Sequence, residues 1–258
     1  MRITASDIVT LYRPAPCPSR VWLREHGVSE SEPGAYDEII EQLGRLHEQK
    51  HLISLGVYED ISAVEPEGRA TKTLESIRAH VPVIYQGEFR VQTTLSGTVV
   101  EVVGRPDYLI IDGDNYLIRD SKLSRKVDED HHEEIVLQVQ LYGWLFERAV
   151  GLSAKRLEVL TGTGAVVEIP YDSGVAALGK LGEVLALKQM VAEPYEPVGW
   201  SKCGSCRFTE NCWPRALERL DVSLVMDVDQ GLARQLHANG IVSAGELVAG
   251  YDATRSVN

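Results

Sequence analysis

Features typical of membrane, secreted and strongly basic proteins are missing from this sequence. No apolar run approaches the ~20 residues that a helix needs to cross a bilayer. The first residues, MRITASDIV, have neither the basic nor the apolar stretch of a secretory signal. Basic residues are scarce, with 26 Lys and Arg against 38 Asp and Glu, which disfavours a protein that coats nucleic acid by charge alone. We therefore expect a cytoplasmic protein that makes no membrane contact. An acidic, metal-dependent enzyme acting on nucleic acid stays compatible with this balance.

Cysteine is scarce and unevenly spaced. Of the four cysteines, Cys17 stands alone, whereas Cys203, Cys206 and Cys212 lie within ten residues. Without a secretion signal, this spacing indicates a metal or cluster site rather than disulfides. Thiolates suit both zinc and an iron–sulfur cluster, so the spacing leaves both open. One site made of all four thiols would join the N-terminal and C-terminal segments. In the alternative, Cys17 is an ordinary buried cysteine.

The periodicity of apolar residues predicts an α/β chain. Stretches rich in Val, Ile, Tyr and Thr, with the turn sequences LSG and DGDN, predict consecutive antiparallel strands between residues 81 and 123. Two more strands are expected at 155–162 and 165–171. Helices are expected within residues 6–27, 35–56, 69–81, 131–150 and 174–192. This order predicts one central mixed sheet flanked by helices.

The sequence pattern predicts that the C-terminal residues form a separate segment. Residues 231–250 predict a helix, a tight turn and a second helix. We expect a main domain over residues 1–218 and a small helical tail over 219–258. The tail is either a plain helical cap, which the sequence favours, or a DNA-binding hairpin of helices.

Asp120 and Lys122 end a predicted strand, and they share one face because alternate side chains of a strand do so. A hairpin through DGDN would bring Asp107 of the preceding strand close to Asp120. Two converging carboxylates repel each other unless a cation lies between them, and a hard divalent cation is the usual solution. Lys122 could then position or activate a water molecule. A charged, solvated strand edge is the alternative, and the same spacing at Glu48 and Lys50 is expected to be helical surface charge.

Polar residues elsewhere could complete such a site. Gln138 and Tyr142 are one helical turn apart, and His47 lies on an earlier helix. A lone histidine is also typical of a half-buried polar position. The full pattern, in chain order, resembles the RecB-like branch of the PD-(D/E)XK nuclease superfamily: His47, Asp107, Asp120, Lys122, Gln138, Tyr142.

This resemblance implies a restriction-endonuclease-like core. It implies that Mg²⁺ or Mn²⁺ is bound by His47, Asp107, Asp120 and the Ser121 carbonyl. Lys122 would help to activate water, while the glutamine–tyrosine pair Gln138 and Tyr142 would contact DNA or brace the site. The sequence departs from the family in one respect, because Gly44 precedes His47 by three positions rather than four. His51 therefore stays open as a substitute for His47.

The cysteines are similar to those of the iron–sulfur nucleases of the RecB family, including the CRISPR-associated RecB-like exonucleases and the AddB nuclease domain. The likeness implies a structural [4Fe–4S] cluster held by Cys17, Cys203, Cys206 and Cys212. Beside it we expect a DNA-binding wall of basic residues, made by Arg20, Arg24, Lys202 and Arg207. Nearby aromatic residues are expected to pack around the cluster rather than stack on bases: Trp200, Phe208, Trp213.

The function expected from these patterns is a Mg²⁺- or Mn²⁺-dependent deoxyribonuclease. We favour an exonuclease acting on single-stranded DNA ends in repair, defence or CRISPR spacer acquisition, with protein partners from those pathways. The alternative is a zinc- or cluster-stabilised, noncatalytic DNA-binding or scaffolding protein.

Overall fold

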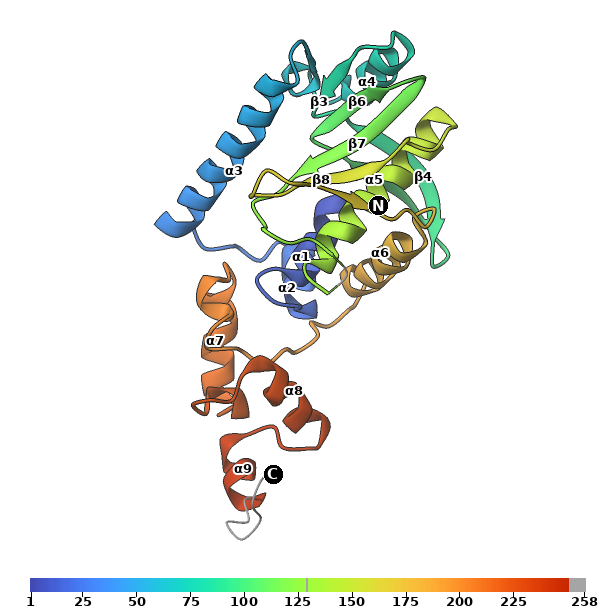
Figure 1. Cartoon of the computed structure of the whole chain (residues 1–258). Helices are drawn as coiled ribbons and strands as arrows, with labels where there is room; N and C mark the ends of the chain where they lie inside the picture. Colours follow the sequence, from blue (N-terminus) through green and yellow to red (C-terminus); the bar gives the residue numbers. More distant parts are fainter. Residues whose placement is uncertain (129, 251–258) are drawn as a thin grey trace. The chain divides into compact units, whose positions relative to one another are not determined.

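The structure, a computed structural model, describes residues 1–128 and 130–250 and divides into two compact units (Figure 1). Each unit is built from two separate stretches of sequence. The first unit combines Met1–Thr10 with Gly34–Ala186, and the second combines Leu11–Pro33 with the described residues from Leu187 onward. The boundary expected after residue 218 falls inside the second unit.

The first unit contains two mixed sheets, whereas one was expected. The larger sheet has six strands in the order β2-β3-β6-β7-β8-β9, and the smaller has three in the order β1-β5-β4. The larger sheet comprises β2 (Glu59–Asp60), β3 (Val83–Tyr85), β6 (Tyr108–Asp112), β7 (Asn115–Ser121), β8 (Leu157–Leu160) and β9 (Val166–Ile169). The smaller comprises β1 (Arg2–Thr4), β4 (Phe89–Leu95) and β5 (Thr98–Gly104).

Two interruptions separate the β4–β5 hairpin from the larger sheet. Between β3 and β4, Gln86 adopts a left-handed conformation with φ of 55°. Between β5 and β6 stands Pro106, which has no N–H to continue a ladder. The hairpin pairs instead with β1, which runs parallel to β5. A strand of three residues whose partner lies about a hundred residues away carries no periodic signal, and β1 was not predicted.

The predicted helices are present, with shifted ends. In the first unit they are α1 (Ala5–Tyr12), α3 (Ala35–Ser54), α4 (Arg69–Arg78), α5 (Glu133–Val150) and α6 (Val175–Lys188), and the last two residues of both α1 and α6 belong to the second unit. The first unit also contains a 3-10 turn, η1 (Ile61–Ala63). No helix of the described chain has the length and apolar character needed to span a membrane.

Helix α5 contacts strands of both sheets, β4 and β5 in the smaller and β7 and β8 in the larger. It is buried all round from Glu134 to Phe146. Gly104 permits its close approach to β5, because a Cβ atom there would lie 2.9 Å from Cδ1 of Tyr142 and would also overlap Leu145. The backbone of β5 therefore helps to determine where Tyr142 lies.

The second unit is mainly helical. It contains α2 (Pro18–Glu25), η2 (Cys203–Ser205), α7 (Thr209–Glu218), η3 (Val222–Leu224), α8 (Gln230–Ala238) and α9 (Ala244–Gly250). The predicted helix, turn and helix are thus present as α8 and α9. They pack on η3 around a small apolar core that includes Val222, Val228 and Ala233.

Candidate functional site

The hairpin of β6 and β7 brings the two predicted acids together. Asp107 directly precedes β6, and Asp120 lies in β7, which is antiparallel to β6. The Asp107 Oδ2 atom accepts a hydrogen bond of 2.7 Å from the backbone N–H of Ser121. Asp120 is 1% exposed and forms an ion pair with Lys122. Both acids and the lysine therefore converge at the end of β7, so the solvated-edge alternative is wrong for Asp120.

Burial and mutual repulsion shape the charges of this group. Burial, followed by the nearby charge of Asp120, raises the pKa of Asp107 well above its usual value. Burial lowers the pKa of Lys122, but the carboxylates of Asp120 and Asp107 outweigh burial, and the net pKa is raised. Lys122 is accordingly an ammonium ion at neutral pH, which suits the placement of a water or phosphate oxygen better than proton abstraction.

Glu48 is a third carboxylate at this site, and it was wrongly interpreted as surface charge. Its Oε1 atom accepts a hydrogen bond of 2.6 Å from Nε2 of Gln86, which also donates to Asp107 Oδ1 at 2.9 Å. The hydroxyl of Tyr108 donates to the Glu48 backbone carbonyl at 2.7 Å. Burial and a hydrogen bond to Glu48 raise the pKa of Tyr85.

The orientation of α3 explains why Glu48 was missed. The apolar residues that predicted this helix are exposed, including Leu43 at 48% and Ile53 at 77%. The helix contacts β7 and brings Glu48 close to Asp107. Carboxylate and imidazole side chains that face a sheet are unusual on a helix unless they are hydrogen-bonded, paired with a charge or bound to a metal. The signal available in the sequence was Glu48 itself, directly after the predicted ligand His47.

The two histidines of α3 have different surroundings. Within the described part of the chain, the buried Nε2 atom of His47 has no hydrogen-bond partner. The ring of His51 packs edge-on against Tyr108, and its Nε2 atom lies 3.0 Å from Arg119 Nη1. Because a guanidinium can only donate, Nε2 of His51 must be the acceptor. Burial, followed by the charge of Arg119, lowers the pKa of His51. Of the two, His47 is thus the histidine whose Nε2 atom is not engaged by a described residue.

Gln138 and Tyr142 are buried on α5, at 5% and 4% exposed. Burial and the charges of Asp120 and Asp107 raise the pKa of Tyr142, while a hydrogen bond with Gln138 opposes that rise. Gln138 Oε1 is buried, and no described residue donates a hydrogen bond to it. Tyr142 therefore lies within electrostatic reach of the acids, and this burial suits bracing better than contact with DNA.

The donors at this site suit a hard divalent cation. Carboxylate oxygens come from Asp107, Asp120 and Glu48, and the imidazole of His47 adds a nitrogen ligand. The unsatisfied Nε2 atom of His47 and the raised pKa of Asp107 are both features that a bound cation would relieve. In the described residues, no group of three or more His, Cys, Asp or Glu side chains is arranged so that it could hold a metal ion.

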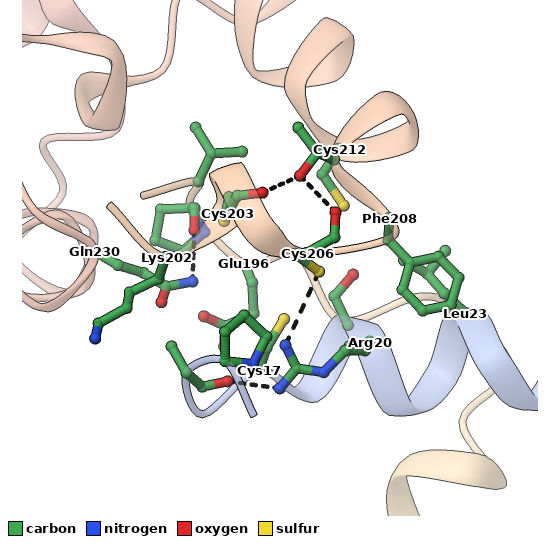
Figure 2. Close-up of a pocket in the computed structure, with 16 residues that line it drawn as sticks. Cys17, Arg20, Leu23, Glu196, Lys202, Cys203, Cys206, Phe208, Cys212 and Gln230 are labelled. Carbon is green, nitrogen blue, oxygen red and sulfur yellow. Dashed lines mark hydrogen bonds between the residues drawn. The ribbon is translucent and has the colours of Figure 1, made fainter. Parts of the chain in front are cut away.

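The second unit brings the four cysteines around one pocket (Figure 2). Cys17 precedes α2, Cys203 begins η2, Cys206 follows it, and Cys212 lies in α7. All four are free thiols of intermediate exposure. Burial raises the pKa of Cys17 to about 11, and it also raises the pKa values of Cys203 and Cys212.

Several N–H groups are directed at the sulfur atoms of this pocket. The backbone N–H of Gly199 donates to Cys203 Sγ at 3.2 Å. Arg215 lies 3.6 Å from Cys212 Sγ. Arg20 lies 3.9 Å from Cys206 Sγ, a contact that Figure 2 shows. Donors of this kind stabilise a thiolate relative to a thiol.

The expected basic wall beside the cysteines is only partly exposed. Arg20 is 7% exposed, and its guanidinium donates to the carbonyls of Leu11 and Ala15 as well as lying near Cys206. Three of the guanidinium donors of Arg20 are thus engaged inside the unit, which is an arrangement that favours a structural role over a contact with DNA. Arg24 and Arg207 both form ion pairs with Glu30.

The aromatic residues near the cysteines fall into two groups. Phe208 is 2% exposed and lines the cysteine pocket, as expected for a packing residue. Trp200 is 57% exposed and lies edge-on to Trp213, with 5.0 Å between ring centroids. Lys202 lines the same pocket as the cysteines.

Two acids and a lysine lie at the end of a strand hairpin, with carboxylate and imidazole groups on a helix alongside, which is the arrangement that the sequence resemblance predicts for a restriction-endonuclease-like core. A family model of the PD-(D/E)XK nuclease superfamily matches residues 25–213. The chain belongs to this superfamily, whose members are generally metal-dependent nucleases. The matched range includes every residue predicted to bind Mg²⁺ or Mn²⁺, together with Gln138 and Tyr142, but not Cys17.

Solved structures are also similar to this chain. One of them, described as "Crystal structure of SSO0001", is 19% identical in sequence and has a TM-score of 0.41. The similarity covers 82% of this chain and 85% of that one. None of the curated proteins compared with the chain matches it.

Proposed function

We propose that this protein is a deoxyribonuclease that uses Mg²⁺ or Mn²⁺ to hydrolyse phosphodiester bonds. The observation that carries the proposal is the convergence of Asp107, Asp120 and Lys122, with both acids held in place by hydrogen bonding or ion pairing. Asp107, Asp120, His47 and the Ser121 carbonyl would bind the cation.

Glu48 adds to this ligand set. Its carboxylate is held beside Asp107 by Gln86, and it contributes to the raised pKa of Asp107. We assign it as a third carboxylate available to a cation, either directly or through a water. Three acids and one ammonium leave the group with net negative charge, which favours a divalent cation over a monovalent one.

The chain's own residues carry out distinct parts of the reaction. Asp107 and Asp120 present oxygen ligands in a fixed orientation. Lys122, as an ammonium ion, donates hydrogen bonds that orient the attacking water and offset the charge that develops on the phosphoryl oxygens. Gln138 and Tyr142 brace this group from α5. When bound, the cation supplies Lewis-acid polarisation of the phosphate and lowers the pKa of a water molecule.

The cysteine pocket supports a second part of the proposal, a structural [4Fe–4S] cluster. Four free thiols face one pocket, and N–H donors from Gly199, Arg20 and Arg215 are directed at three of them. Such donors stabilise the sulfur ligands of iron–sulfur clusters. A tetrahedral zinc ion is the alternative occupant, and the two are distinguished by iron content and by broad absorbance near ~400 nm.

The substrate proposed is DNA with a free or single-stranded end, in repair, defence or CRISPR spacer acquisition. Membership of the superfamily supports a nucleic-acid substrate. The preference for DNA ends rests on the sequence resemblance to RecB-like exonucleases. The noncatalytic alternative is disfavoured by Lys122, because a site without a function would not need a half-buried lysine beside the buried Asp120 and the half-buried Asp107.

Digestion of two substrates tests the proposal. Anaerobically purified protein is incubated with Mn²⁺ and end-labelled linear single-stranded DNA, or with circular single-stranded DNA of the same sequence. We expect degradation of the linear DNA, no cleavage of the circular DNA, and complete inhibition by EDTA. If both DNAs are cleaved, the protein is an endonuclease rather than an exonuclease. If neither DNA is cleaved, the proposal that the protein is an enzyme is wrong.

A further inference from the structure

We infer that Gln86 is a positioning residue that sets the separation of Glu48 and Asp107 and so prepares them to bind a cation. This inference rests on the proposed metal-dependent activity. Gln86 stands at the turn between β3 and β4, outside the sequence pattern that predicted the site.

The side chain of Gln86 bridges the two carboxylates through a single nitrogen atom. Its Nε2 atom lies 2.6 Å from Glu48 Oε1 and 2.9 Å from Asp107 Oδ1. The amide NH₂ group has two hydrogen atoms, one for each acceptor. The amide oxygen could not replace it, since a second acceptor facing two carboxylates would be repelled. The orientation of the amide is therefore fixed by its neighbours.

A neutral donor is well suited to this position. Glu48 and Asp107 repel each other, and a lysine or arginine between them would neutralise the charge that attracts a cation. An amide holds the two groups together while leaving their negative charge intact. Each carboxylate oxygen keeps lone-pair capacity beyond the bond it accepts from Gln86.

Asp107 is constrained at both of its carboxylate oxygens. Gln86 holds Oδ1, and the backbone N–H of Ser121 holds Oδ2 at 2.7 Å. The backbone N–H of Gln86 also donates to the Asp107 carbonyl at 2.8 Å. The plane of the Asp107 carboxylate is thus set by two elements, the β3–β4 turn and β7, before a cation arrives.

The backbone at Gln86 points to the same role. Its φ of 55° lies in the left-handed region, where glycine and asparagine are preferred. Gly87 directly follows Gln86. The left-handed conformation nevertheless falls on the glutamine and not on this glycine. A glutamine in this conformation is a local cost that a useful side chain would offset.

The test is Gln86→Asn, which keeps the amide and suits the left-handed backbone but is one methylene too short to reach both acids. The measurements are the affinity for Mn²⁺ by titration calorimetry, the Mn²⁺ concentration for half-maximal DNA cleavage, and the melting temperature. Gln49→Asn is the matched control, because Gln49 is exposed on α3 beside Glu48.

We expect Gln86→Asn to weaken Mn²⁺ binding by about 10-fold or more, as is typical when a residue that orients metal ligands is lost. The half-maximal Mn²⁺ concentration should rise in parallel, while cleavage at saturating Mn²⁺ falls much less and the melting temperature stays near or above that of the wild type. Gln49→Asn should change none of these.

Two results would overturn the inference, and they distinguish failure of the inference alone from failure of the proposed function. If Gln86→Asn binds Mn²⁺ as the wild type does, while Asp107→Asn does not bind it, Gln86 is only a turn residue and the metal site stands. If the wild type shows no Mn²⁺ binding that depends on Asp107, the proposed function fails, and the inference fails with it.

Discussion

The two candidate sites differ in how the fold balances charge within each. In the first unit, Asp120 is paired with Lys122, and both oxygens of Asp107 accept hydrogen bonds. In the second unit, burial favours neutral thiols at Cys17, Cys203 and Cys212, whose pKa values are raised. The protein's own hydrogen bonds and ion pair hold the carboxylate site together, whereas the buried thiols would be stabilised as thiolates by a bound metal, with their protons released to solvent. We therefore expect catalysis to depend on one site and stability on the other.

The largest expected effect is on cleavage. Lys122→Ala should reduce the rate of DNA cleavage at saturating Mn²⁺ by at least about 100-fold, because the ammonium that orients water and offsets phosphate charge is lost. The overall fold and DNA binding should persist. Single-turnover kinetics, circular dichroism and a DNA-binding titration measure the three properties.

Lys126→Ala is the control for that variant. Lys126 is 70% exposed and lies only four residues from Lys122 in the sequence. The substitution Lys126→Ala therefore removes the same charge from a position outside the site. Equal activity of the two variants would contradict the role of Lys122.

The second effect concerns the cysteine pocket. Cys206→Ala should abolish absorbance near ~400 nm and lower the free energy of unfolding by more than about 2 kcal/mol, because cofactor binding and folding are coupled. Absorbance spectra, iron analysis and chemical denaturation check this. Ser205→Ala is the control, since Ser205 is the exposed neighbour, and retained colour in Cys206→Ala would count against the cluster.

A third prediction tests whether packing positions the first site. Gly104→Ala should cost about 1–3 kcal/mol, since the added methyl group overlaps Tyr142 and Leu145. Cleavage should also fall, because Tyr142 lies near both acids. Gly179→Ala in α6 has no neighbouring atom within 4 Å and should be neutral or slightly stabilising. Thermal melting and cleavage rates of both variants provide the comparison, and equal stability would show that α5 can shift freely.

The smallest effect is the pH dependence of the second unit near its C-terminal helices. Burial would raise the pKa of Asp221, but hydrogen bonds from Ser223 and Tyr195 outweigh it, and the pKa is lowered from its ordinary value of 3.8. Asp221 therefore contributes stability that is fully present above pH 3.8 and is lost as the pH falls through the lower folded value.

Asp221→Asn checks this sign. The variant should melt a few degrees below the wild type at pH 5, and the difference should narrow toward pH 3. A difference that stays constant with pH would contradict a role for the charge of Asp221.

The sequence predicted the parts of the site that depend on local geometry. Asp120 and Lys122 share a face because strands alternate, and the DGDN turn determines how Asp107 meets them. Glu48 and Gln86 lie outside this logic. Their contact depends on how α3 packs against the sheet and on a left-handed turn at a residue that is not glycine. Neither leaves a periodic pattern.

The same distinction holds for the fold. Helices and hairpins were predicted from periodicity and turn residues, including the helix pair at the end of the described chain. The smaller sheet depends on β1 pairing with β5, which lies about a hundred residues further along the chain, and no local signal encodes this pairing. Arg20 was expected in a basic wall beside the cysteines, but it is buried, and it donates to carbonyls of its own unit and lies near Cys206.

The interleaved order of the two units has a consequence for synthesis on the ribosome. Residues 11–33 emerge early, but the rest of their unit begins only at residue 187. The intervening stretch contains nearly all of the unit that carries the acids, so that unit can begin to fold first. During that interval Cys203, Cys206 and Cys212 have not yet been synthesised, so the four-thiol pocket that includes Cys17 can form only after Cys212 has emerged.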